Sequence, residues 1–208
     1  MKSYLFHICL ALLIPNLLGA QPKYFSKIYD NGVFQSFRSV KSINDKFIFL
    51  GNFTTSQIPW SIMLFNMDNN CDSIWKKEIV LPEGEIVSGD FVITASGYTM
   101  VGNKTLLWED NYTTAYQAHL TTTDTEGNLA NIIPLSSLPS TALGITSTED
   151  GGYLIIGSII PNYPNVLPYD IQMYAVKLNH QFAIEWERIY NDMGFSYDNY
   201  LTDIMPAP

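Results

Sequence analysis

The sequence has few of the residues from which disulfide networks, metal sites and most catalytic centres are built. It contains two cysteines and three histidines in 208 residues. Cys9 lies in an N-terminal segment that we expect to be removed, which leaves Cys71 without an internal partner. His119 and His180 have no second ligand at metal-binding spacing. We therefore predict neither a metal site nor a bound cofactor.

Charged residues are also scarce, and their balance is acidic. They make up 15% of the chain, and the formal net charge is −9. Because phosphates are recognised by a clustered basic surface, this composition excludes nucleic acid as a partner. The G-x-S-x-G nucleophile motif and the phosphate-binding glycine loop are also absent. These absences favour a protein without catalytic activity.

The only long apolar run lies at the N-terminus. Residues 1–20 have the pattern of a secretion signal, with Lys2 before a mostly apolar stretch and Leu18-Gly19-Ala20 as a small-residue cleavage site. The run is short for a membrane span, and no second apolar segment could cross a bilayer. We predict a secreted or cell-surface protein without a membrane span.

A repeated segment is the most informative feature of the chain. Residues 150–157, Asp-Gly-Gly-Tyr-Leu-Ile-Ile-Gly, form a turn followed by an apolar strand that ends on glycine. Weaker copies occupy residues 44–51 and 95–102, so the closing glycines Gly51, Gly102 and Gly157 are 51 and 55 residues apart. A period of this size indicates a repeat architecture.

Other positions follow the same period. A turn residue recurs at Asp68, Asp124 and Asn179, and seven residues after each comes Trp75, Asn131 or Trp186. The segments that begin at Trp75 and Trp186 share the order aromatic, polar, basic, any, apolar, which the middle copy has lost. We predict that both tryptophans pack between neighbouring repeats.

Each repeat is predicted to contain four short antiparallel strands. In the third repeat the strands are expected near residues 143–148, 153–158, 172–178 and 182–190, and they are rich in Val, Ile, Tyr, Phe and Thr. Four strands in about 50 residues are typical of a β-propeller blade. The sequence therefore predicts an all-β propeller with about three blades, at residues 33–79, 84–135 and 141–190, in an incomplete ring.

Both ends carry fragments of the repeat. Residues 23–29 match the fourth strand of a unit without the three strands before it, and residues 197–208 resemble the start of a further unit. The next Asp-Gly-Gly turn would fall just past Pro208. We therefore expect the chain to be truncated, with further blades or a sorting domain beyond Pro208.

The motifs resemble a known family. The patterns D-G-G-Y-L-I-x-G, x-V-K-L-[DN] and W-x-[KR]-x-[YF] are similar to the propeller repeats of secreted Bacteroidota proteins, and the third repeat matches best, at residues 150–157, 176–179 and 186–190. The resemblance implies a secreted propeller of the kind that often precedes a C-terminal domain used by the type IX secretion system.

Three catalytic or metal-binding alternatives are weaker. Glu185 and Glu187 alternate around Trp186 and could form a carboxylate pair, although a solvated charged face fits an outer strand better. Residues 68–79 begin like a calcium loop but lack its glycine and its final carboxylate. Residues 148–152 loosely resemble the Asp-box of sialidases, which need three arginines where this chain has two.

The long loops between the second and third strands of each repeat are the predicted binding site. Exposed aromatic residues are common at recognition surfaces. The candidates are Trp60, Trp108, Tyr112, Tyr163 and Tyr169. We expect a glycan or peptide ligand there, or else that these aromatic side chains fold back over the blades.

Three functions remain open on the sequence alone. The first is a secreted, non-enzymatic propeller that binds a ligand or acts as a surface scaffold. The second is a fragment of a propeller hydrolase acting on glycans, and the third is a passive spacer in a longer protein. Converging carboxylates would favour the hydrolase, whereas exposed aromatics alone would favour binding.

Overall fold

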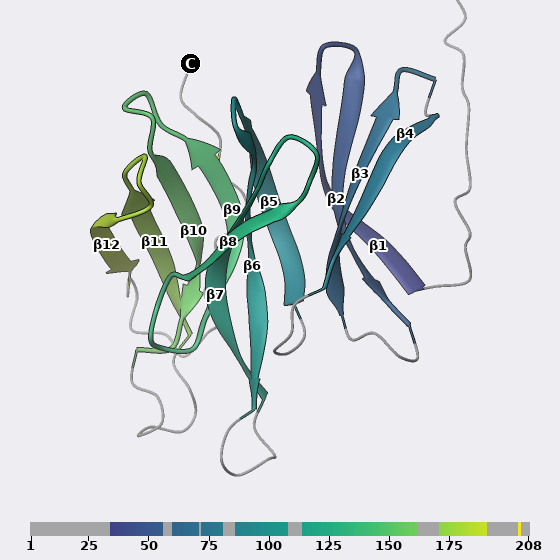
Figure 1. Cartoon of the computed structure of the whole chain (residues 1–208). Helices are drawn as coiled ribbons and strands as arrows, with labels where there is room; N and C mark the ends of the chain where they lie inside the picture. The colour runs from purple at the N-terminus through teal and green to yellow at the C-terminus, as the bar shows by residue number, and fades with distance from the viewer. Residues whose placement is uncertain are drawn as a thin grey trace, which may run out of the picture. The chain divides into compact units, whose positions relative to one another are not determined.

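The protein consists of three antiparallel sheets of four strands each (Figure 1). The structure, a computed structural model, describes residues 34–55, 60–70, 72–80, 86–107, 114–161, 171–190 and 204, and these contain no helix. All three sheets belong to one compact unit, Gly32–Pro208. The predicted all-β class is confirmed, and the sheets do not close into a ring within the described residues.

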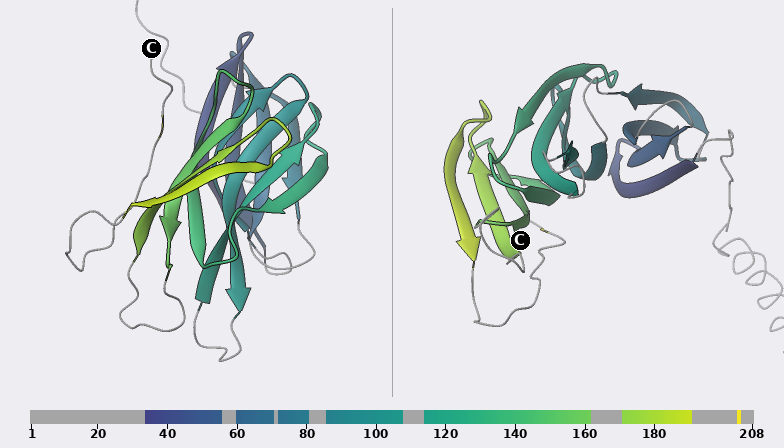
Figure 2. Two further views of the ribbon diagram at one scale, coloured as in Figure 1. Left: turned by 90° about the vertical axis from the view of Figure 1, so that its left-hand side faces the viewer. Right: turned by 90° about the horizontal axis from the view of Figure 1, so that it is seen from below.

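Each sheet is a simple meander in which successive strands are neighbours, and Figure 2 shows the sheets from two further directions. The first sheet contains β1 (Phe34–Ile43), β2 (Lys46–Thr54), β3 (Ser61–Asp68) and β4 (Ser73–Ile79). The second contains β5 (Ile86–Thr94), β6 (Gly97–Leu107), β7 (Thr114–Thr123) and β8 (Leu129–Pro134). The third contains β9 (Ser140–Ser147), β10 (Tyr153–Ile159), β11 (Gln172–Leu178) and β12 (Ile184–Tyr190), close to the strands predicted for it.

The core consists of two apolar clusters, one on each face of the second sheet. Met100 of β6 joins residues of the first sheet such as Leu50 and Leu64, whereas its neighbour Val101 joins residues of the third sheet such as Ile155. This division follows from the strand period of two, which sends successive side chains to opposite faces. The second sheet is therefore held on both sides, and each buried aliphatic side chain contributes roughly 1.5–3 kcal/mol.

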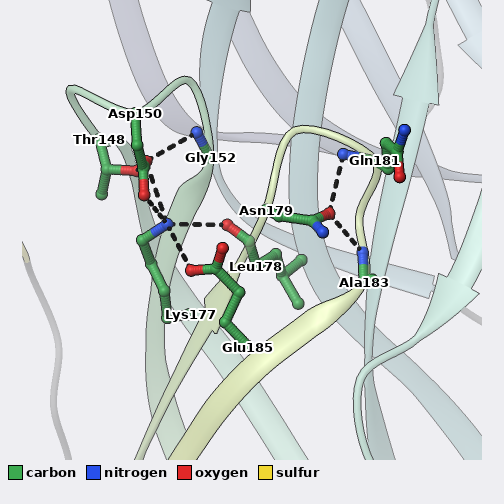
Figure 3. Close-up of polar contacts among 9 residues, drawn as sticks. All are labelled: Thr148, Asp150, Gly152, Lys177, Leu178, Asn179, Gln181, Ala183 and Glu185. Carbon is green, nitrogen blue, oxygen red and sulfur yellow. Dashed lines mark hydrogen bonds and ion pairs between the residues drawn. The ribbon is translucent and has the colours of Figure 1, made fainter.

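The recurring residues Asp68, Asp124 and Asn179 each close the turn between the third and fourth strands of their sheet. The side-chain oxygen of each accepts hydrogen bonds from the backbone N–H groups two and four residues later, at 2.8–3.0 Å. Figure 3 shows this arrangement for Asn179, with Gln181 and Ala183 as the donors. Because only a short side chain with an oxygen acceptor can close such a turn, Asp or Asn recurs with the period of the repeat.

The two tryptophans of the repeat have different surroundings. Trp75 packs against the cluster between the first and second sheets, with its ring centroid 6.0 Å from that of Tyr98, as predicted. Trp186 occupies the equivalent place on β12 but is 39% exposed, and the Arg188 guanidinium lies 5.4 Å from its ring centroid. The prediction is therefore confirmed for Trp75 and wrong for Trp186, whose face carries no further sheet among the described residues.

Several sequence predictions lie outside the described residues. These are the secretion signal at residues 1–20, the strand at 23–29, and all of segment 197–208 except Ile204. The Ile204 side chain lies against β9, with its Cγ2 3.2 Å from where a Cβ on Gly144 would stand. Among the described residues no helix is long and apolar enough to cross a membrane.

Candidate functional site

In every sheet the first strand has one bulge, at which its pairing with the second strand shifts by one or more residues. The register shifts between Phe37 and Ser39 in β1, between Ser88 and Phe91 in β5, and across Leu143 in β9. A bulge bends its strand and redirects its side chains. The fold therefore places an irregular segment at the same position in three neighbouring strands.

The closing glycines of the sequence motif lie opposite these bulges. Gly51 pairs with Phe37, Gly102 with Ser88, and Gly157 with Ala142. A Cβ on Gly51 or Gly157 would overlap a carbonyl oxygen of the facing strand. The glycines thus allow close approach at the bulge, and they lie inside the strands rather than at the ends predicted from the sequence.

The bulges converge on a pocket of about 420 Å³, which we call the first-strand pocket. This volume falls within the range of roughly 300–1,000 Å³ that is usual for small-molecule sites. The residues that line it are Arg38, Ser39, Val40 and Lys41 of β1, Gly89 and Asp90 of β5, and Leu143 of β9. All three sheets contribute, so the pocket depends on how the sheets pack.

Asp90 organises the polar side chains of the first-strand pocket. Its carboxylate accepts a hydrogen bond of 2.5 Å from the Ser39 hydroxyl and forms an ion pair of 3.1 Å with Lys41. The Lys41 ammonium also lies 5.9 Å from the ring centroid of Phe91. The Asp90 side chain is 13% exposed and that of Lys41 is 39% exposed, so the pair is only partly shielded from water.

Arg38 differs from the other charged residues of the pocket. It is the bulge residue of β1 and is exposed. Its side chain forms no hydrogen bond or ion pair within the part of the chain that the structure describes. With Lys41 neutralised by Asp90, the lining carries one unmatched positive charge, although the chain as a whole is strongly acidic.

The predicted aromatic site stays a prediction. Trp60 directly precedes β3, is half-buried and does not line the first-strand pocket. Trp108, Tyr112, Tyr163 and Tyr169 lie outside the described residues. The sequence reasoning missed Asp90 and treated Arg38 only as one of two arginines. A usable signal was the Gly89-Asp90 pair, which interrupts the otherwise mostly apolar strand from Ile86 to Thr94.

A second polar cluster holds the third sheet together (Figure 3). The buried Lys177 ammonium lies 2.8 Å from the Asp150 carboxylate, 3.1 Å from that of Glu185 and 3.1 Å from the Leu178 carbonyl oxygen. The hydrogen bond from Lys177 holds the pKa of Asp150 well below its usual range, and that with Asp150 raises the pKa of Lys177. The cluster joins a turn to strands β11 and β12, so we assign it a structural role.

This cluster explains two motifs of the sequence. Asp150 also accepts a hydrogen bond of 3.0 Å from the Gly152 N–H, and a Cβ on Gly152 would stand 2.6 Å from the Lys177 ammonium. The Asp-Gly-Gly turn and the lysine of the V-K-L-[DN] motif therefore belong to one contact. We therefore assign both motifs a structural role.

The carboxylate pair considered from the sequence does not form. Glu185 contacts Lys177, whereas the Glu187 carboxylate accepts a hydrogen bond of 2.9 Å from the Tyr174 hydroxyl. Tyr174 and Lys177 lie three residues apart on β11 and face opposite sides of the sheet. Among the described residues no group of three or more His, Cys, Asp or Glu side chains could hold a metal ion.

Comparison with known proteins supports the fold. The matching solved structures include the crystal structure of an ACO/RPE65 chimera, a β-propeller, with a TM-score of 0.50 and 13% sequence identity. The match covers 78% of this chain but 40% of the chimera. No protein-family model and no curated protein matches the chain. At this identity the likeness concerns the fold alone, and it is consistent with a propeller-like all-β protein.

Proposed function

We propose that the chain is a secreted, non-enzymatic β-propeller module that binds its ligand in the first-strand pocket. Propeller blades surround a central channel, and in this protein the first strands of consecutive sheets lie next to each other. The observation that carries the proposal is the convergence of three bulges on one polar pocket. Bulges are common next to functional sites, where they re-aim side chains.

The charges of the pocket favour binding over glycan hydrolysis. Most glycosidases need two carboxyl groups, one on each side of the scissile bond. Asp90 is the single carboxylate among the residues that line the pocket, and it is already engaged by Ser39 and Lys41. A hydrolase would need a second carboxylate from residues that the structure does not describe.

A printed array of oligosaccharides and peptides tests binding against the passive-spacer alternative. Leu143→Trp should fill the pocket and abolish whatever binding the wild-type chain shows. Ile74→Trp is the matched control, because Ile74 is 45% exposed on β4 and does not line the pocket. Binding that survives Leu143→Trp would place the site elsewhere, and a wild-type chain that binds nothing on the array would favour the spacer.

The secretion part of the proposal depends on residues 1–20 and on the resemblance to Bacteroidota propeller repeats. If the segment is a signal, a bacterial host should export the chain and remove it. Mass spectrometry of the exported protein should then show Gln21 as the N-terminal residue. Retention of Met1 on a protein that stays in the cytoplasm would contradict secretion.

A further inference from the structure

The unmatched positive charge of the first-strand pocket identifies the class of ligand. We propose that the pocket recognises the carboxylate of an acidic sugar, with Arg38 as the anchor; this inference depends on the binding function proposed above. Arg38 lines the pocket beside an ion pair that is already complete, so its guanidinium is the cation available to a ligand. A guanidinium can hold a carboxylate through two parallel hydrogen bonds.

The net charge of the pocket separates a carboxylate from a phosphate. Arg38 and Lys41 are positive and Asp90 is negative, so the lining residues carry a single net positive charge. A carboxylate brings one negative charge, whereas a phosphate monoester brings about −1.5 to −2 at neutral pH. The remaining negative charge of a phosphate would face a chain whose formal net charge is −9.

The polar groups next to Arg38 suit the hydroxyls of a sugar. An ionised carboxylate offers about four acceptor positions, and Ser39 and Lys41 use only part of those on Asp90. Sugar hydroxyls can donate to the remaining positions while the ligand carboxylate contacts Arg38. The pocket of about 420 Å³ has room for a ligand of this size.

Arginine resonances provide a direct test, because the chain has two arginines, Arg38 and Arg188. The Nε–H signals of the mature chain are followed by NMR during titration with glucuronate, glucose and glucose 6-phosphate. We expect a saturable shift of the Arg38 signal with glucuronate, a much weaker response to glucose, and weaker binding of the phosphate. Arg188 is the internal control, because it lies over Trp186 and not in the pocket.

Variants give the matching affinities. Arg38→Gln should weaken glucuronate binding by tenfold or more, because a hydrogen bond to a charged group contributes about tenfold or more to affinity. Arg38→Lys, which keeps the charge, should weaken it by a smaller factor. Arg188→Gln should leave binding unchanged. Thermal melting verifies that each variant folds.

Each outcome decides a separate claim. Equal shifts of both arginine signals would show a non-specific effect of the anion and overturn the proposal, as would unchanged affinity in Arg38→Gln. Tighter binding of glucose 6-phosphate than of glucuronate would show that the pocket recognises a phosphate rather than a carboxylate, and would overturn the proposed ligand class. If Arg38 stays silent while Leu143→Trp still abolishes binding on the array, the pocket binds a ligand but the acidic class is wrong.

Discussion

The two interfaces between the sheets have the same design and differ in how well their polar groups are paired. In both, an asparagine after the closing glycine reaches the first strand of the next sheet. Asn52 Oδ1 accepts hydrogen bonds from the Ser88 N–H and hydroxyl at 2.7 and 2.9 Å, and Asn103 Oδ1 accepts one from the Ala142 N–H at 2.7 Å. These bonds lock each sheet to the bulge of the next.

The difference lies at the residue that pairs with the closing glycine on the third strand. In the third sheet this is Tyr174, whose hydroxyl lies 3.2 Å from the carbonyl oxygen of Leu135, which directly follows β8, and 2.9 Å from Glu187. In the second sheet it is His119, which is 2% exposed. Among the described residues neither nitrogen of His119 has a hydrogen-bond partner.

Further unpaired atoms lie, like His119, in the interface between the first and second sheets. Asn52 Nδ2 and Thr121 Oγ1 are also buried without a partner in the described part of the chain. A buried polar group without a partner costs about 1–3 kcal/mol. We therefore infer that the interface between the first and second sheets is the less stable of the two, and among the described residues its apolar cluster is also the smaller, with 8 buried residues against 12.

The two equivalent tryptophans allow the largest test, because one lies in the first interface and the other on an outer face. Trp75→Ala removes a ring that packs on Tyr98 and should lower the free energy of unfolding by about 3 kcal/mol. Trp186→Ala removes a ring that is 39% exposed and should cost about 1 kcal/mol or less. Chemical denaturation of both variants measures the difference, and equal losses would show that the face of Trp186 is covered in solution.

Acid should act on the first interface through His119. Burial lowers its pKa to about 4 from 6.5; the nearby Gln117 backbone partly opposes this shift, and the charge of Lys104 adds to it. Between those values the unfolded chain binds the proton and the folded chain does not, so stability falls as the pH falls through this window. From pH 7 to pH 5 the loss should be about 2 kcal/mol.

Melting curves at pH 7 and pH 5 measure this loss. Asp124 and Asp150 do not interfere, because hydrogen bonds hold the pKa of each carboxyl below its usual range and both stay ionised in the window. A variant without the imidazole, such as His119→Met, should lose most of the dependence. The same pH dependence in that variant would assign it to other groups.

The repeats could be predicted from the sequence, whereas the first-strand pocket could not. Asp68, Asp124 and Asn179 recur because each closes a turn with local hydrogen bonds, and a local requirement leaves a periodic trace in the sequence. The first-strand pocket leaves no such trace. It joins Arg38, Asp90 and Leu143 from three sheets, and the bulges that bring them together depend on packing between strands.

The prediction for Trp186 failed for a related reason. Its position in the repeat equals that of Trp75, but its burial depends on a neighbouring sheet rather than on its own strand. The Asp-Gly-Gly motif was read correctly as a turn, whereas its contact with Lys177, 27 residues later, appeared only in the folded chain.

The two interface asparagines should also differ. Asn103→Ala leaves the Ala142 N–H buried without its acceptor and should cost about 2 kcal/mol. Asn52→Ala takes the acceptor from the Ser88 N–H and from the Ser88 hydroxyl, which is free to rotate, but it also removes the unpaired Asn52 Nδ2, so its cost should be smaller by about 1 kcal/mol. Urea denaturation compares the two variants, and a larger loss for Asn52→Ala would show that Asn52 Nδ2 is well solvated.

The smallest expected effect is a gain in stability at position 119. Met63 occupies this position in the first sheet and is fully buried, so the fold accepts a flexible apolar side chain there. His119→Met replaces two unpaired nitrogens with an apolar side chain that can adapt to the space and should raise the free energy of unfolding by about 1 kcal/mol at pH 7.

Tyr174→Met is the matched control for this substitution. It places the same side chain at the equivalent position of the third sheet, where it deletes a hydroxyl that is hydrogen-bonded, and it should destabilise the protein by 1 kcal/mol or more, on the order of one lost hydrogen bond. Opposite signs for the two changes, measured by denaturation at one pH, would confirm that pairing of polar groups distinguishes the interfaces. A loss of stability in both variants would mean that the His119 imidazole is satisfied by water within the interface, and the two interfaces would then be equivalent.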